Sequence, residues 1–94
     1  MSIARITKVQ MSSKEAADEQ SQGYTQNAPS EFPQASQMIG LRISDDTIMA
    51  VTIYPDEDAM KDADAAREKR LDTNKDNRFS VETFVGHVTL NHQN

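Results

Sequence analysis

The 94-residue sequence contains no cysteine and no tryptophan, and it has only three glycines and three prolines. The lack of cysteine excludes a disulfide framework, a thiolate zinc site, an iron–sulfur cluster and a cysteine nucleophile. No run approaches the roughly 18 consecutive apolar residues that a membrane span needs. The first ten residues, MSIARITKVQ, also lack the apolar centre of a secretion signal. We therefore expect a soluble, cytoplasmic protein with no membrane contact.

Apolar residues are scarce as well, at 36% of the chain, and the net charge is −5. The length fits one small domain, so we expect a single α+β domain spanning residues 1–94. A thin core of this kind gains stability from a second copy of the chain. The acidic balance argues against a nucleic-acid partner. Most acids lie between Asp45 and Asp76, interleaved with Lys and Arg, which is typical of a solvated helix face.

The first third of the chain predicts a strand, a helix and a loop. Residues 2–10 contain Ile3, Ile6, Thr7 and Val9 and no glycine or proline, which favours a strand with apolar residues on both faces. Ser12, followed three residues later by Glu15, has the spacing of a capping box, and a helix is predicted from Lys14 to about residue 26. Ala28-Pro29 should end that helix. In the loop that follows, Phe32 is expected to anchor against the core.

Residues 37–44 and 47–54 are two further apolar runs separated by Asp45-Asp46, a pattern that predicts a β-hairpin. If the turn has two residues, Leu41 shares one face of the sheet with Ala50, and Arg42 shares the other with Met49. Both faces then carry apolar side chains, which predicts a sheet covered on both sides.

Pro55 ends the third strand, and Asp56 can cap a helix that runs to Leu71. A polar loop over residues 72–78 leads to a last strand over residues 79–92, in which Gly86 suggests a bulge. The order β-α-β-β-α-β predicts a ferredoxin-like plait, with a four-stranded antiparallel sheet and two helices on one face. Because the other face is apolar, we expect a second subunit to cover it and to form a homodimer.

With these elements in place, the chain resembles the dimeric α/β-barrel superfamily, especially small antibiotic-biosynthesis-monooxygenase-like proteins. The resemblance rests on MSIARITKVQ, MIGLRIS, AVTIYPDEDAM and ETFVGHVTL. It implies a homodimer with a pocket between sheet and helices for aromatic or polyketide-like molecules. Some members oxidise substrates with O₂ and no prosthetic group, and related ones degrade haem. These proteins usually employ an Asn, a Trp and an Arg or His. The absence of tryptophan, of a histidine in the second helix and of an Asn in the first strand argues against haem degradation.

Three polar residues are candidates for a site between sheet and helices. Arg42 lies among apolar strand residues and could meet an anionic or carbonyl group, or it could extend its charge to the rim of the sheet. Tyr54 ends the third strand, where its phenol could bind a ligand or its ring could pack. His87 is the only histidine within a regular element and could act as a general base near neutral pH, or it could be structural.

Residues Asp72 to Phe84 resemble an EF-hand calcium loop, with Asp72, Asn74 and Asp76 at the first, third and fifth positions. The sixth position is Asn77 instead of glycine, and the twelfth is Thr83 instead of glutamate. The segment that follows is strand-like instead of helical. A polar loop between helix and strand is the main interpretation, with calcium binding a distant alternative.

The leading functional hypothesis is therefore a homodimer that binds, and in one version oxidises, a small aromatic or apolar molecule without a cofactor. Arg42, Tyr54 and His87 are its candidate catalytic residues, and no metal is expected. The alternative is a non-catalytic dimerisation module whose sheet face serves only for assembly. The sequence leaves open whether the protein is an enzyme.

Overall fold

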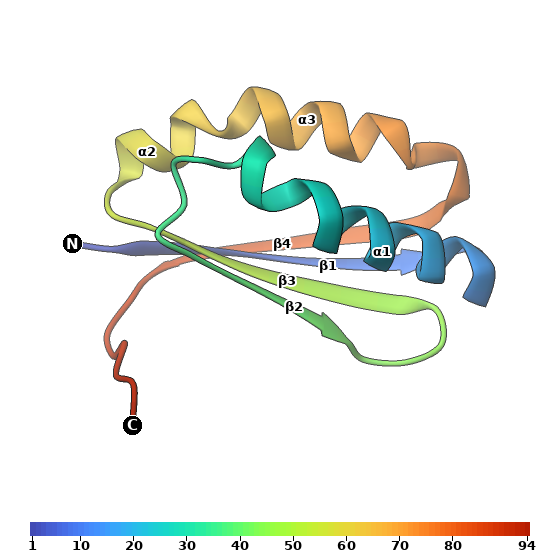
Figure 1. Ribbon diagram of the computed structural model, residues 1–94, viewed down its shortest axis with the longest axis horizontal. Helices are drawn as coiled ribbons and strands as arrows, with labels where there is room; N and C mark the ends of the chain where they lie inside the picture. The colour runs from blue at the N-terminus through green and yellow to red at the C-terminus, as the bar shows by residue number, and fades with distance from the viewer.

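The computed structural model describes residues 1–94 and confirms the predicted ferredoxin-like α+β fold. Four antiparallel strands form one sheet in the order β2-β3-β1-β4, and all the helices lie on one side of it (Figure 1). No helix combines the length and apolar character of a transmembrane span. The elements are β1 Ile3–Met11, α1 Lys14–Glu31, β2 Gln37–Arg42, β3 Thr47–Tyr54, α2 Glu57–Asp62, α3 Asp64–Thr73, a 3₁₀ turn Lys75–Asn77 and β4 Arg78–His87.

The first helix is longer than predicted, because Pro29 lies inside α1 and does not end it. Proline removes one backbone donor and its ring crowds the carbonyl four residues earlier, so local preference alone would end the helix here. The turn is held by packing, since Ala28 is fully buried and Phe32, whose N–H donates to the Ala28 carbonyl, is also buried. The expected role of Phe32 as an anchor is thereby confirmed. Ser13 caps the helix start by accepting from the N–H of Ala16.

The hairpin has a register one residue away from the two-residue-turn prediction. Arg42 pairs with Ile48 and Gly40 with Ala50, so Arg42 shares the helix-covered face with Ala50, and Leu41 lies opposite. A shift of one residue exchanges the two faces of a strand. The longer connection is stabilised by Asp46, whose carboxylate accepts from the hydroxyls of Ser44 and Thr47.

The second predicted helix is divided at Ala63 into α2 and α3. Asp56 caps α2 as expected, accepting from the N–H of Ala59 at 2.8 Å. The break coincides with Arg5 of β1, whose guanidinium donates to the Met60 carbonyl and to the Asp64 carboxylate. One arginine therefore satisfies the end of α2 and the start of α3, which favours a break at this point.

The last strand ends at His87, five residues earlier than predicted. Its irregularity lies at Phe79, because Gln10 pairs with Ser80 and Met11 with Arg78, leaving Phe79 as the extra residue of a bulge. Gly86, where a bulge was predicted, pairs regularly with Ala4. Residues 88–94 carry no regular structure.

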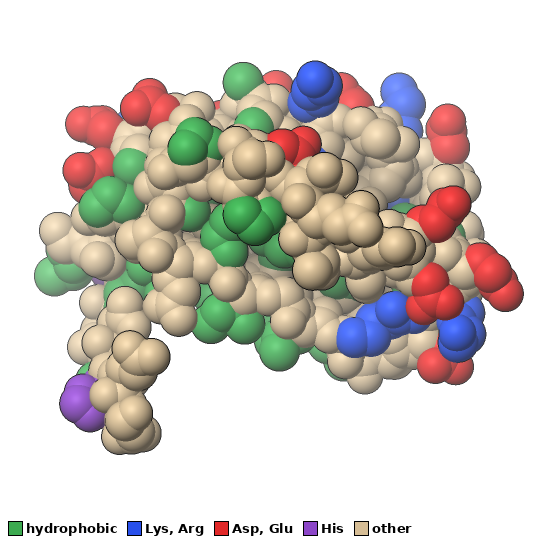
Figure 2. All heavy atoms as spheres, viewed as in Figure 1, with side chains coloured by type: hydrophobic (Ala, Val, Ile, Leu, Met, Phe, Trp, Pro, Cys, Tyr) green, Lys and Arg blue, Asp and Glu red, His purple; other side chains and the backbone are tan.

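The core between sheet and helices consists of two separate apolar clusters. One is Ile3, Ala28, Phe32, Tyr54, Met60 and Ala63, and the other is Val9, Met11, Ala16, Ala17 and Ile48. The sheet face away from the helices has no covering layer (Figure 1). We call it the bare face; hydrophobic side chains reach the surface along the strands in Figure 2. Its exposed apolar residues include Ile39, Leu41 and Phe84.

Candidate functional site in the helix–sheet layer

A pocket separates the two core clusters and lies between the sheet and the helices. Its cavity volume is about 70 Å³. We call it the helix–sheet pocket. It is lined by residues of β1, β3, α1 and α3 and by the residues that directly follow the two helices. The lining residues are Thr7, Val9, Gln20, Tyr24, Phe32, Ile48, Ala50, Thr52, Tyr54, Arg67, Arg70, Leu71 and Asn74.

The α3 wall of this pocket is polar. Arg67, Arg70, Leu71 and Asn74 follow the spacing i, i+3, i+4, i+7, which places them on one side of the helix. All four line the pocket. A helix packed on a sheet usually presents apolar side chains at these positions. Here α3 presents two arginines, and an asparagine follows at its C-terminal end.

Three of the arginines between sheet and helices, Arg5, Arg67 and Arg70, differ in their partners. Arg5 forms an ion pair with Asp64 at 2.6 Å, and Arg70 forms one with Glu31 at 2.6 Å. Arg67 takes part in none of the ion pairs and donates only to two hydroxyls, those of Thr7 at 3.3 Å and Thr83 at 2.7 Å. Burial, and secondarily the nearby charge of Arg5, lowers the pKa of Arg67 from its ordinary value of 12.5.

Tyr54 is the aromatic residue at the end of β3, and it is 2% exposed. Its ring packs in the cluster with Ile3 and lines the pocket, and the Arg5 guanidinium lies 6.0 Å from the ring centre. Burial raises the pKa of the Tyr54 phenol above its ordinary value of 10.0, and the charge of Arg5 acts in the opposite direction. The phenol is therefore neutral and able to donate a hydrogen bond at physiological pH.

A second, larger hollow lies between α1 and the edge strand β2, with a volume of about 410 Å³. We call it the α1–β2 groove. Its lining includes Tyr24, Gly40, Arg42 and Ile48, and two of these, Tyr24 and Ile48, also line the helix–sheet pocket. Gly40 lies against the Tyr24 ring, and a Cβ there would stand 3.8 Å from it, an ordinary van der Waals contact. Tyr24 therefore forms the partition between groove and pocket.

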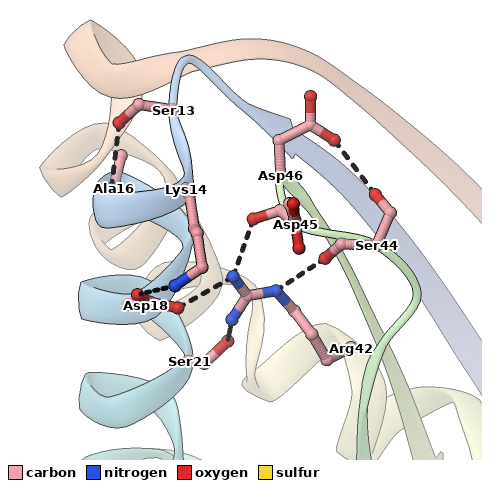
Figure 3. A network of polar contacts seen from close by, with 9 residues as sticks. All are labelled: Ser13, Lys14, Ala16, Asp18, Ser21, Arg42, Ser44, Asp45 and Asp46. Carbon is pink, nitrogen blue, oxygen red and sulfur yellow. Dashed lines mark hydrogen bonds and ion pairs between the residues drawn. The ribbon is translucent and has the colours of Figure 1, made fainter.

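Arg42 lines the groove, not the pocket, and its guanidinium is held by neighbours (Figure 3). It donates to the Asp18 carboxylate at 2.8 Å, to the Ser21 hydroxyl at 3.4 Å and to the carbonyls of Ser44 and Asp45 at 2.7 Å. These contacts tie α1 to the β2–β3 connection. The hydrogen bond from Arg42, followed by that from Lys14, lowers the pKa of Asp18 below its ordinary value of 3.8.

His87 ends β4 and is exposed. It pairs with Ile3, which pairs on its other side with Tyr54, so His87 and Tyr54 are two strand spacings apart, about 10 Å. Arg42 pairs with Ile48, six residues along β3 from Tyr54, which corresponds to about 20 Å. The three candidates predicted from sequence are thus not gathered in one place, and only Tyr54 lines the helix–sheet pocket.

Sequence inspection missed Arg5, Arg67, Arg70 and Asn74. A signal was available for two of them, because Arg67 and Arg70 stand at helical spacing with Leu71, on its side of α3. Their alternation with acids favoured a solvated face, and only the packing of α3 on the sheet separates its inner side from its outer one. Arg5 gave no signal, since one arginine in a strand has no preferred face.

The loop that resembles an EF-hand does not have the geometry of a calcium site. Asn74 is buried, and its side-chain oxygen accepts from Arg78 at 2.8 Å, so the third and seventh positions of the presumed loop bind each other. No group of three His, Cys, Asp or Glu side chains is placed to hold a metal ion. Arg78 also donates to the Leu71 carbonyl, which closes the C-terminal end of α3.

No family model and no curated protein matches the chain. Solved structures of similar shape do exist. A mutant of SnoaB, a cofactor-independent oxygenase from Streptomyces nogalater, is 15% identical with a TM-score of 0.78 over 96% of this chain and 95% of that one. A candidate antibiotic biosynthesis monooxygenase from Chloroflexus aurantiacus is 11% identical with a TM-score of 0.80, covering 99% and 98%.

A dimeric ferredoxin-like protein from an uncultured marine organism is 9% identical, with a TM-score of 0.79 over 99% of this chain and 92% of that one. The similarity predicted from the sequence is therefore confirmed for the fold, which this chain shares with antibiotic-biosynthesis-monooxygenase-like proteins. At these identities the likeness extends to the fold alone.

Proposed function

We propose that the protein is a homodimer that binds a small aromatic or apolar molecule in the helix–sheet pocket and oxidises it with O₂ and no prosthetic group. The observation that carries the proposal is a pocket between two core clusters, with an apolar wall that includes Tyr54 and a polar wall along α3, in the fold of a cofactor-independent oxygenase. Ligand sites are typically apolar hollows with a few placed polar groups.

The dimer part of the proposal is supported by the bare face. Ile39, Leu41 and Phe84 are each between 40% and 53% exposed there. Contiguous apolar surface of this kind typically marks an interface. The dimeric ferredoxin-like protein of the same fold supports a second copy as the partner, and we place the dimer in the cytoplasm.

The volume of the pocket constrains how a ligand enters. About 70 Å³ holds a few waters, whereas small-molecule sites typically measure roughly 300–1,000 Å³. The α1–β2 groove, about 410 Å³, lies on the other side of Tyr24. We infer that the Tyr24 ring turns aside when a ligand binds and joins the two spaces. Tyr54 then faces the ligand inside, Arg42 lies at the groove end, and His87 stands at the open edge of the sheet.

The test combines light scattering with binding and oxygen uptake, using naphthol as a small aromatic probe. We expect a dimer that binds naphthol, and Ala50→Leu, which places a larger side chain in the pocket, should abolish binding. Ala65→Leu, on the exposed side of α3, is the matched control. Naphthol binding that persists in Ala50→Leu would show that the site lies elsewhere.

The catalytic assignment is tested by Tyr54→Phe, Arg42→Gln and His87→Gln. If Tyr54 positions the substrate, its substitution should reduce oxygen uptake most. Probe binding without any oxygen uptake would support a binding protein. A dimer that binds no probe would support the alternative of a non-catalytic dimerisation module. The small volume of the cavity is compatible with that alternative.

A further inference from the structure

We propose that the ligand of the helix–sheet pocket carries one anionic oxygen on an apolar body, as an aromatic carboxylate does, and that Arg67, Arg70 and Asn74 bind that oxygen. This inference rests on the proposed function, because it names the chemical class of ligand for the same pocket. It is independent of whether a reaction follows binding.

The first observation is that hydrogen-bond donors at the pocket lack acceptors. Arg70 Nε and Asn74 Nδ2 are both buried, and neither has a protein partner. Buried donors are nearly always paired, and leaving one unpaired destabilises a protein unless a ligand or water satisfies it. The one other such atom, Gln34 Oε1, belongs to a residue outside the pocket lining. The buried polar atoms of the pocket residues that lack a hydrogen-bond partner are therefore both donors, and a ligand would satisfy them with an acceptor atom.

The second observation is the charge balance of the layer. The charged residues of the pocket lining are Arg67 and Arg70, no carboxylate lines the pocket, and only Arg70 has a carboxylate partner, Glu31. The residue without a carboxylate is Arg67, whose partners are the neutral hydroxyls of Thr7 and Thr83. A partly buried charge of this kind is stabilised by a counter-charge, which one anionic oxygen on the ligand supplies.

The third observation is that the same donors come from one helix surface. Arg67 and Arg70 stand at positions i and i+3 of α3, Asn74 is the residue that follows the helix, and all three line the pocket. Opposite them stand Ile48, Ala50 and Tyr54 of β3. The arrangement therefore offers donors on one wall and apolar surface on the other. It suits a molecule with a single charged end, and a polyanion would exceed the one uncompensated charge.

A structural role for Arg67 is the competing explanation, since its two hydroxyl contacts connect α3 to β1 and β4. The two roles differ in what they predict for ligand preference. A structural tie affects stability alone, whereas an anion site discriminates between an anion and a neutral molecule of the same shape.

The experiment compares benzoate with benzamide, its neutral isostere, by titrating the full-length protein and following backbone NMR shifts. We expect benzoate to bind about tenfold or more tightly than benzamide, the effect of one charge-assisted hydrogen bond. Arg67→Gln should remove this preference, and Arg67→Lys should restore part of it. Lys69→Gln, which removes one charge from the exposed side of the same helix, should leave the preference unchanged.

Asn74→Asp provides a second variant that should preserve the fold. The new carboxylate can still accept from Arg78, as the Asn74 oxygen does, while the free donor is replaced by a negative charge. We expect benzoate affinity to fall by about tenfold or more, with benzamide affinity unchanged. Thermal melts of each variant check that the fold persists.

The outcomes separate this inference from the proposed function. Equal binding of benzoate and benzamide, both lost in Ala50→Leu, overturns the anion site and leaves the pocket as a ligand site. A benzoate preference that survives in Arg67→Gln and Asn74→Asp places the anion elsewhere and also overturns the inference. If benzoate does not bind at all, the inference is wrong, and the naphthol titration decides the proposed function separately.

Discussion

The two faces of the sheet each depart in part from the pattern that a two-layer α+β domain usually shows. The helix-covered face carries buried Arg5 and Thr52 and borders a pocket lined by Arg67 and Asn74. The bare face carries Ile39 and Phe84 at the surface. Antiparallel sheets normally place apolar residues against their helices and polar ones in water. The covered face therefore combines two apolar core clusters with a partly polar pocket, and the bare face exposes apolar side chains to solvent.

The division of the core explains how the covered face can accommodate polar groups. The cluster around Tyr54 and the cluster around Val9 each close one end of the layer, and the polar pocket lies between them. Buried arginines are tolerated where their donors are satisfied. Arg5 meets this condition by binding both the Met60 carbonyl and Asp64 at the break between α2 and α3.

The largest expected effect comes from placing a charge on the bare face. Val51 lies on the central strand β3, between Ile6 and Ile39, and Val51→Glu would bury an unpaired carboxylate in the proposed dimer interface. An uncompensated buried charge costs about 3–5 kcal/mol, so the dimer dissociation constant should rise by more than about 100-fold. Light scattering measures it, with Gln22→Glu on the exposed side of α1 as control. A wild-type chain that is already monomeric would refute the comparison.

A second prediction contrasts one phenylalanine on each side of the sheet. Phe32→Ala should lower the free energy of unfolding by about 3–5 kcal/mol, because Phe32 is buried among Ile3, Tyr54 and Met60. Phe84→Ala should change the stability of an isolated subunit by at most about 0.5 kcal/mol, as at other surface positions, yet weaken dimerisation. Urea unfolding at several protein concentrations separates the two effects. An equal, concentration-independent loss in both variants would contradict the proposed roles.

A third prediction concerns the buried phenol of the covered face. In Tyr24→Phe, the remaining tyrosine absorbance reports Tyr54, and we expect it to ionise above pH 10.0 because burial raises its pKa. The folded state then holds its proton more tightly than the unfolded state. This contribution to stability is complete below pH 10.0 and is lost as the pH rises through the folded pKa. Ionisation at or below pH 10.0 in the folded protein would show that Tyr54 is solvated.

The smallest expected effect belongs to the exposed network around Arg42. Because Arg42 and Lys14 lower the pKa of Asp18, the stabilisation from Asp18 is present above pH 3.8 and is lost as the pH falls through the folded pKa. Asp18→Asn should therefore slightly reduce the loss of unfolding free energy at acid pH. At pH 7 the stability should change little, because exposed ion pairs contribute little. Urea midpoints across the acid range measure it, with Glu19→Gln as a control on the same helix. An unchanged acid limb would mean that the pair is not formed in solution.

Much of the fold could be predicted from the sequence because its signals are local. The bounds of β3, the capping by Asp56 and the burial of Phe32 depend on neighbours along the chain. The errors arose where distant contacts outweigh local preference. Packing of Ala28 and Phe32 carries α1 through Pro29, and Arg5 lies at the break in the second helix although 55 residues separate it from Met60.

The candidate site was predictable only in part. Tyr54 was expected at the pocket and lines it, whereas Arg42, chosen because it lies among apolar strand residues, lines the α1–β2 groove. The arginines and the asparagine of α3 were taken for part of a solvated or loop surface. Their inward direction depends on how α3 is oriented on the sheet, which periodicity alone does not determine.

The sequence by itself determined the order of strands and helices, the apolar character of both sheet faces and the absence of thiol chemistry, because these follow from local pattern and composition. Tertiary structure alone decided which strand residues face the helices, since a single-residue shift in register exchanges the faces. It also decided that Arg67, Arg70 and Asn74 meet at one pocket with unmatched donors. A charged side chain on a helix faces solvent or a pocket depending on which side of the helix packs on the sheet. That packing is formed by residues far apart in the chain, so the sequence pattern alone does not reveal it.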